Sequence, residues 1–267
     1  MLLASLYAYA IFASTIWQRM ALVVLTALLA LALWQKARDQ LPYLLDPAAS
    51  PPSRVGLADG LIAALLFFVL QGFAVGSLTL GEGALTGRVV LIAFLLAGAA
   101  TYGAMRLVYW RLNTEGVPKM FGPHLGRALL AGGAGGLGAS IAAIAYLRLA
   151  AHTPLVTRLP ETIISPRGGV LWLALLAVVA APIFEEFIFR GLIFAGLRRT
   201  LGLTASLIAS AAIFALVHPP PAVIPVFGLG VAAALAYEAT GVLLAPMLVH
   251  AFYNAAVITY QSFASGL

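Results

Sequence analysis

Residues 181–191, A-P-I-F-E-E-F-I-F-R-G, impose the strongest constraint on the structure, because they set two adjacent carboxylates and an arginine inside a long apolar run. On membrane-insertion scales, one Asp, Lys or Arg at the centre of a transmembrane helix costs roughly 2.5 to 3.5 kcal/mol. An ionisable cluster at that depth is therefore a functional-site hypothesis by default. Glu185 and Glu186 therefore need polar partners or water from other parts of the chain.

The composition of the chain indicates a membrane protein. Of its 267 residues, 63% are hydrophobic and 9% are charged, and the mean hydropathy is +1.03, whereas soluble domains contain about 25% charged residues. Uncharged apolar runs long enough to cross the hydrocarbon layer recur along the chain. Because these runs are continuous and do not alternate as barrel strands do, we predict an all-α fold, a polytopic transmembrane helical bundle.

Charge and cysteine content exclude several classes of function. The net charge is +6, but the basic residues are scattered through short loops, so we expect the lipid bilayer and no nucleic acid as a partner. The absence of cysteine excludes disulfides, thiolate metal ligands and a cysteine nucleophile. Residues 1–17 lack a positively charged beginning and a clear cleavage site, so we expect no removable signal peptide.

The chain divides into an N-terminal part and a membrane bundle. Residues 1–54 hold apolar segments up to residue 34, which form one helix or two, and then a polar linker. Residues 55–267 form the bundle, so the total is eight or nine membrane helices. The seven spans that we predict after the linker are residues 57–76, 89–110, 128–150, 169–197, 203–218, 222–237 and 242–261.

Basic residues predict the orientation of these spans. If the spans alternate, one side of the membrane carries Lys36, Arg38, Arg54, Arg111, Lys119, Arg127, Arg198 and Arg199, and the other carries Arg88, Arg148, Arg158 and Arg167. The richer side is expected to be cytoplasmic, which places the loop near Glu238 inside and the C-terminus outside. In the third span, residues 132–136 read G-G-A-G-G, a small-residue spacing that predicts close helix packing.

The charged residues of the central stretch divide into two groups on a helical wheel. Glu186 and Arg190 lie about 40° apart and predict an i, i+4 ion pair on one helix. Glu185 lies about 100° to 140° from both and has no local counter-charge. Pro182 must remove one helix hydrogen bond just before the glutamates, so we expect a kink there, which a plain packing role would also explain.

Two of the four histidines lie inside predicted spans. His124 and His152 fall in loops and are expected to be solvated, whereas His218 ends F-A-L-V-H and His250 begins H-A-F-Y-N, with Asn254 one turn on. Each intramembrane histidine taken singly is equally well explained as a hydrogen-bonded packing residue, and counting from the helix ends does not place the polar groups at one depth. Because unsatisfied polar groups are costly in lipid, we nevertheless predict that the catalytic residues are Glu185, His218, His250 and Asn254, gathered in one pocket.

Such a pocket suits hydrolysis. An apolar environment disfavours the charged form of a glutamate, so Glu185 can accept a proton from water, and His218 can hold that water. His250 and Asn254 can donate hydrogen bonds to an oxygen that becomes negative, a role worth roughly 3 to 4 kcal/mol per good donor. No G-x-S-x-G context is present for a covalent route.

Two other uses of the same residues remain open. Two histidines and a carboxylate also form a catalytic zinc set, although H-E-x-x-H spacing is missing, and we expect no cofactor. A proton-coupled transporter also uses intramembrane Glu and His, but residues 57–150 hold no matching set of polar groups.

Three motifs in order, E-E-F-I-F-R-G at 185–191, F-A-L-V-H at 214–218 and H-A-F-Y-N at 250–254, resemble the signature of the CPBP group. This group comprises the CAAX prenyl endopeptidases and bacteriocin-processing (Abi) proteins, which are regarded as intramembrane glutamic proteases. The resemblance covers a catalytic core at about residues 168–260. It implies that Glu185 and His218 activate water, that His250 and Asn254 form the oxyanion site, and that Glu186 and Arg190 support the first motif.

The resemblance also implies the class of substrate. We expect a membrane-associated peptide or protein, lipidated in the best-known targets of the group, although some members act in bacteriocin immunity, so a non-proteolytic immunity protein is a further alternative. The richness in Ala, Leu and Gly is typical of a multi-pass protein of a bacterial or archaeal plasma membrane.

Overall fold

The computed structural model describes residues 56–82, 86–111, 118–151, 153 and 170–264, and the single positions 30 and 34. The predicted N-terminal helices and linker in residues 1–54 lie outside the described residues apart from those two positions, as does His152. The total of eight or nine membrane helices is therefore not tested, and the helices below belong to the described part alone.

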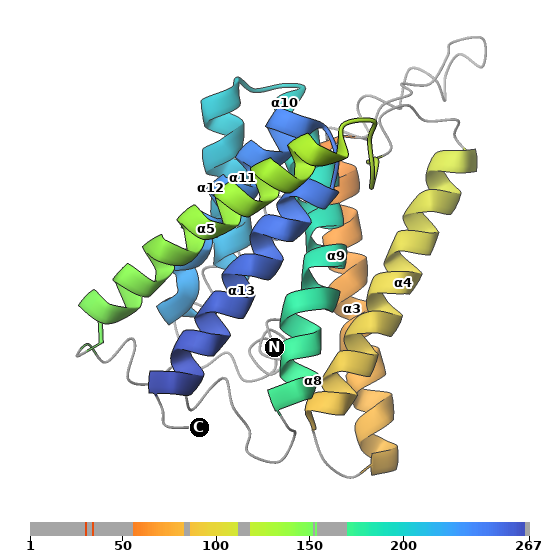
Figure 1. Ribbon diagram of the computed structural model, residues 1–267. Helices are drawn as coiled ribbons and strands as arrows, with labels where there is room; N and C mark the ends of the chain where they lie inside the picture. The colour runs from red at the N-terminus through yellow and green to blue at the C-terminus, as the bar shows by residue number, and fades with distance from the viewer. Residues whose placement is uncertain are drawn as a thin grey trace.

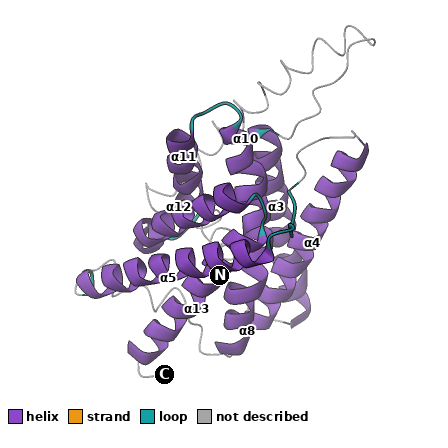
Figure 2. Cartoon of the chain, turned by 45° about the horizontal axis from the view of Figure 1, so that its top comes forward, coloured by secondary structure: helices purple, strands orange, loops and turns teal. Residues whose placement is uncertain are grey.

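Every span predicted after the linker corresponds to helix, and Figure 2 shows no strand in the described ranges. One span is a continuous rod built from short α- and π-helical stretches, α8, η1, α9, η2 and α10. The helices of the bundle are α3 Leu57–Glu82, α4 Gly87–Arg111, α5 Leu125–Leu149, α8 Val170–Leu175, η1 Leu176–Ala180, α9 Ala181–Glu186, η2 Phe187–Phe194, α10 Ala195–Arg198, α11 Leu203–Leu216, α12 Val223–Thr240 and α13 Leu244–Ala264, with a 3-10 turn, η3 Pro220–Ala222, before α12.

Five of these elements are long and apolar enough to cross a membrane, namely α3, α4, α5, α12 and the rod from Leu171 to Arg198. Helix α11 is equally apolar but shorter, at 14 residues. Helix α13 spans 21 residues and carries the polar side chains His250 and Asn254. Several apolar helices of membrane length make the chain a multi-pass integral membrane protein.

The rod occupies the centre of the bundle. All eight residues of η2 are buried, because α3, α11 and α12 pack around this segment, while α4 and α13 contact η1. In Figure 1, α3 and α4 stand on one side of the rod, and α5 crosses obliquely over α13 on the other. The side chains of α9 and η2 are thus enclosed by helices from both halves of the bundle.

Small residues set the distance between α5 and α13, as the spacing predicts. A Cβ added to Gly132 would lie 2.6 Å from Leu248 Cβ, and one added to Gly136 would lie 2.7 Å from Phe252 Cβ. Gly133 has nothing within 4 Å and faces away from α13. The glycines on one face of α5 therefore let it approach the helix that carries His250.

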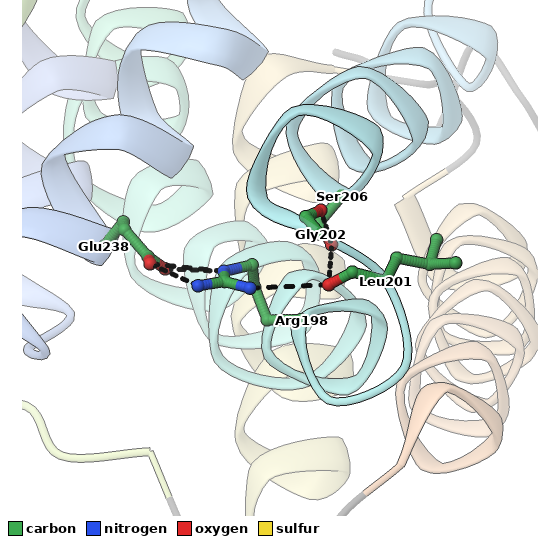
Figure 3. Close-up of polar contacts among 5 residues, drawn as sticks. All are labelled: Arg198, Leu201, Gly202, Ser206 and Glu238. Carbon is green, nitrogen blue, oxygen red and sulfur yellow. Dashed lines mark hydrogen bonds and ion pairs between the residues drawn. The ribbon is translucent and has the colours of Figure 1, made fainter.

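Contacts at one end of the bundle bring together three residues that are predicted to lie on the same side of the membrane. Arg198 at the end of the rod binds Glu238 near the end of α12, with 2.7 Å between Nη2 and Oε1, and donates from Nη1 to the Leu201 carbonyl. Figure 3 shows this pair beside the turn in which Ser206 Oγ donates to the Gly202 carbonyl. Lys119 reaches the same end, since its carbonyl accepts from the Leu243 N–H at 2.8 Å. The cytoplasmic assignment of this end stays a prediction.

Candidate functional site

The backbone of the rod leaves α-helical geometry on both sides of the glutamates. Segments η1 and η2 are π-helical, a register that is rare and concentrated at functional sites. In η1 the Ala181 N–H bonds to the Leu176 carbonyl, five residues back, and Pro182 has no N–H to offer. The Ala177 carbonyl therefore accepts a hydrogen bond neither from Ala181, four residues on, nor from Pro182, five residues on.

Asn254 supplies the missing donor. Its Nδ2 lies 2.6 Å from the Ala177 carbonyl oxygen, so an amide from α13 completes the hydrogen bonding of the rod at the level of Pro182. The sequence predicts the lost hydrogen bond at Pro182, but its replacement from another helix was not anticipated. The amide has a second N–H, which remains for a ligand.

The predicted pair of Glu186 and Arg190 is confirmed. Nη1 of Arg190 donates to Glu186 Oε1 at 3.1 Å, Nε lies 3.1 Å from Oε2, and both side chains are fully buried. The guanidinium also donates from Nη2 to the Gly230 carbonyl, 3.2 Å away, and sits 4.3 Å from the centre of the Phe214 ring. Nε of Arg190 and Oε2 of Glu186 lie within ion-pair distance of each other but make no hydrogen bond.

Glu186 has a second partner that the helical wheel did not reveal. His250 Nδ1 lies 2.8 Å from Glu186 Oε1. Because a carboxylate oxygen accepts, the Nδ1 proton of His250 is the donated one, and Nε2 is left for another partner. Glu186 therefore orients a histidine of α13 as well as neutralising an arginine of its own helix.

His218 lies two residues past the end of α11 and is oriented by that helix. Its Nδ1 donates to the Phe214 carbonyl across 2.7 Å, so the neutral ring presents Nε2 as an acceptor. The Phe214 ring meets the His218 ring edge-on, with 4.6 Å between centroids, and the His250 ring with 5.7 Å. One phenylalanine of the second motif thus holds both histidine rings, although they come from different helices.

Glu185 is buried without a polar partner in the described structure. Its side chain is 3% exposed, and neither carboxylate oxygen makes a hydrogen bond to any described residue. Beside it is a cavity of about 10 Å³ that is also lined by Phe67, Phe68 and Val217, the residue before His218. The remaining residues of its lining, Ala64, Ile188 and Phe189, are apolar, so Glu185 is the one polar residue at this cavity.

The predicted site residues thus come close together in part. Glu185 lines the same small cavity as Val217, the residue before His218, and the rings of His218 and His250 both contact Phe214. Asn254 follows His250 by one turn but is directed at the rod backbone. His124 lies in an exposed position before α5, as expected of a loop residue. The catalytic roles of these residues stay predictions.

The donor set does not form a metal site in the described ranges. No group of three or more His, Asp or Glu side chains is arranged there to hold an ion. The Nδ1 atoms of His218 and His250 are both occupied by protein acceptors, and only their Nε2 atoms are open.

Two further buried residues lie outside the predicted catalytic set. Phe214 begins the second motif, and its ring contacts both histidines and Arg190. Gln71 of α3 is 1% exposed and unpaired among the described residues. An uncharged polar residue within an apolar span was the available signal for Gln71.

Comparison with known proteins finds two matches to the C-terminal part of the chain. The family described as Type II CAAX prenyl endopeptidase Rce1-like matches residues 167–256. The chain is also similar to the membrane-embedded CAAX protease MroQ of Staphylococcus aureus (strain USA300), with 36% identity over 90 residues, which are 31% of this chain and 36% of that protein. The chain thus aligns with about a third of the length of this relative.

No solved structure matches the chain. The family match lies on the segment that begins just before α8 and ends within α13. It contains the paired glutamates, both intramembrane histidines and Asn254, in the order in which the three motifs occur. Through residues 167–256, the chain is thus similar to the CAAX prenyl endopeptidases.

Proposed function

We propose that this protein is an intramembrane endopeptidase that hydrolyses a peptide bond of a membrane-associated substrate with a water molecule activated by Glu185. The observation that carries the proposal is the burial of Glu185 without a polar partner, beside a cavity of about 10 Å³. A buried carboxyl group without a partner is costly, so its retention needs a ligand or a reaction as its reason. The family match at residues 167–256 suggests the class of reaction.

In this mechanism, Glu185 accepts a proton from the water as the water oxygen attacks the carbonyl carbon of the scissile bond. His218 presents Nε2 as an acceptor because Nδ1 is held by the Phe214 carbonyl, and it fixes the second hydrogen of the same water. The carbonyl oxygen becomes negative in the tetrahedral intermediate. Glu185 then delivers its proton to the departing amine, so that the C–N bond breaks and the products are a carboxylic acid and an amine.

The negative charge that develops on the carbonyl oxygen needs hydrogen-bond donors to stabilise it. Asn254 has one N–H left after binding the Ala177 carbonyl. His250 donates from Nε2 when its ring carries both protons, and the Glu186 carboxylate at Nδ1 offsets the positive charge of that form. Preorganised donors of this kind contribute roughly 3 to 4 kcal/mol each to transition-state stabilisation.

The proposed substrate is a membrane-associated peptide or protein. Glu185 lies on the rod, which is long and apolar enough to span the bilayer, so a soluble substrate would have to enter the membrane to reach it. The names of the matched family and of the staphylococcal relative point to substrates ending in a C-a-a-X sequence, and a lipidated tail of this type is the first substrate to test.

The test is cleavage of a synthetic farnesylated C-a-a-X peptide by the purified protein in liposomes. Glu185→Gln is expected to lower kcat at least about hundredfold, the scale of a lost general base. Glu238→Gln serves as a matched control, since it changes a glutamate in the exposed pair with Arg198. Wild-type turnover by Glu185→Gln would overturn the role of this residue.

The same assay, repeated with a strong metal chelator, tests the alternative in which the same side chains bind zinc. Activity that survives strong chelation but is lost in His218→Ala supports glutamate chemistry. Inhibition by the chelator that added zinc reverses would assign the same side chains to a metal site, contrary to the proposal.

A further inference from the structure

The cavity beside Glu185 is too small for the substrate that the proposed function requires. Its volume is about 10 Å³, whereas pockets that bind small molecules measure roughly 300 to 1,000 Å³. Both carboxylate oxygens of Glu185 are buried. A peptide bond can therefore reach them only if part of the cavity wall moves. That wall consists of Ala64, Phe67 and Phe68 from α3, Ile188 and Phe189 from the rod, and Val217.

Most of this wall is held in place by close packing. The buried ring of Phe67 meets the ring of Phe94 edge-on, with 4.9 Å between centroids. The ring of Phe189 makes the same kind of contact with Phe214, also at 4.9 Å, and Phe214 contacts both histidines. The isoleucine and the valine of the wall are buried as well. Movement of these side chains would disturb the core or the arrangement of the histidines.

Phe68 differs from the other large side chains of the wall because it is only partly buried. Leu61 lies seven residues before it and Val75 seven residues after it, and both are buried. Residues seven apart lie about 20° apart around a helix, so the three side chains share one face of α3. Ala64, one turn before Phe68, is also partly buried. The cover of this face is therefore incomplete at the level of the cavity.

The position of Phe68 suits a side chain that opens the cavity towards the bilayer. Leu65 and Val69, which adjoin it on the helix surface, are exposed apolar residues of a membrane-length helix. A phenylalanine ring changes its position by rotation about two bonds, and partly exposed side chains change rotamer quickly, so α3 itself need not move. The methyl group of Ala64 cannot open the wall in this way.

We propose that Phe68 is a specificity-determining residue, which turns aside to admit the substrate and whose ring then limits the size of the substrate side chains beside the scissile bond. The inference rests on the proposed function, which places the scissile carbonyl next to Glu185. The other residues of the wall are apolar, so the enlarged cavity takes an apolar side chain. Shortening Phe68 to a methyl group makes room there for a larger one.

The first test compares two farnesylated peptides that differ only in the residues flanking the scissile bond, valine in one and tryptophan in the other. Phe68→Ala is expected to raise the ratio of kcat/KM for the tryptophan peptide to that for the valine peptide at least about tenfold, the scale on which apolar pockets discriminate by size. Phe68→Leu, which opens less space, is expected to give an intermediate ratio. A wild-type ratio in both variants would overturn the proposal.

Phe73→Ala is the matched control for this comparison. It removes a phenylalanine from the same helix, but one that is 76% exposed and does not line the cavity. We expect it to keep the wild-type ratio. A rise as large as that in Phe68→Ala would show that the effect is a general one of α3, contrary to the proposal.

The second test does not depend on cleavage. The chain contains no cysteine, so Phe68→Cys and Phe73→Cys each introduce a single thiol for labelling with a membrane-permeant maleimide. Both are made in a Glu185→Gln background, in which the peptide is not consumed. The valine peptide is expected to prevent labelling at position 68 and to leave labelling at position 73 unchanged.

The two tests separate the inference from the proposed function. Labelling at position 68 that the peptide does not affect would overturn the contact between Phe68 and the substrate, whether or not the wild-type protein is a peptidase. If the wild-type protein cleaves no peptide but the peptide still protects position 68, the proposed function fails and the contact with Phe68 stands.

Discussion

His250 donates a hydrogen bond from Nδ1 to Oε1 of Glu186 across 2.8 Å, and this single buried contact joins the first and third sequence motifs. Glu186 holds Arg190 at the same time. The second of the two adjacent glutamates therefore belongs to the architecture of the site, and the first, Glu185, is free of such duties in the described structure.

The substitution Glu186→Gln is expected to destabilise the protein by about 3 to 5 kcal/mol, because it leaves the fully buried guanidinium of Arg190 without its counter-charge. Thermal unfolding in detergent, followed by the loss of helical circular dichroism, measures this change.

The exposed pair of Arg198 and Glu238 provides the control for that experiment, since each of its side chains is about a third exposed (32% and 33%). Water and salt replace the lost interaction there, so Glu238→Gln is expected to shift the unfolding midpoint little. Equal shifts in the two variants would show that burial of the Glu186 pair has no energetic consequence.

The substitution Glu185→Gln is expected to leave the unfolding midpoint unchanged or to raise it, in contrast to the neighbouring Glu186→Gln. Neither oxygen of Glu185 has a partner among the described residues, so a neutral amide replaces an unpaired buried acid. The comparison uses the same melting assay. A fall as large as that of Glu186→Gln would mean that Glu185 is a structural residue and not a poised base.

The contact between Asn254 and the Ala177 carbonyl predicts an energetic coupling with Pro182. Asn254→Leu alone is expected to cost about 1 to 3 kcal/mol, because it leaves a carbonyl without a donor inside the membrane. In a Pro182→Ala background, residue 182 regains an N–H, and the same substitution is expected to cost less.

A double-mutant cycle of the two substitutions measures this coupling, expected at about 0.5 kcal/mol or more. Additive effects would show that the missing proline N–H is not the reason why Asn254 binds the rod.

Two adjacent glycines of α5 are expected to respond in opposite ways to alanine. Gly132→Ala places a Cβ 2.6 Å from Leu248 Cβ and forces α5 away from α13, for which we expect a loss of about 1 to 3 kcal/mol and a lowered kcat through displacement of His250. Gly133→Ala meets nothing within 4 Å and is expected to be neutral or stabilising by up to about 1 kcal/mol.

Unfolding midpoints and peptide turnover of the two variants check this pair of expectations. A Gly133→Ala protein that is as damaged as Gly132→Ala would mean that the glycines act through backbone freedom and not through the approach of α13.

Local features of the sequence predict a large share of this structure. The length of each apolar run predicts a span, and seven predicted spans correspond to helix in the described ranges. Periodicity on one helix predicts the pair of Glu186 and Arg190, because residues four apart share a face whichever helices surround them. The cost of polar groups in lipid predicts that His218 and His250 approach each other, and both pack on Phe214.

Counting residues from the helix ends did not place these groups at one depth. The π-helical segments of the rod and the oblique course of helices such as α5 change the relation between residue number and depth (Figure 1). A count that assumes straight, upright α-helices cannot include either effect.

The sequence was sufficient for three properties that depend on one helix in lipid: the presence of an apolar helix, its polar face and its internal ion pair. Packing between helices was needed to assign His250 to Glu186, Asn254 to the Ala177 carbonyl and Gly132, but not Gly133, to α13. The physical reason is that an internal pair is set by the fixed repeat of the helix, whereas a contact between helices depends on tilt, rotation and register, which many side chains determine together.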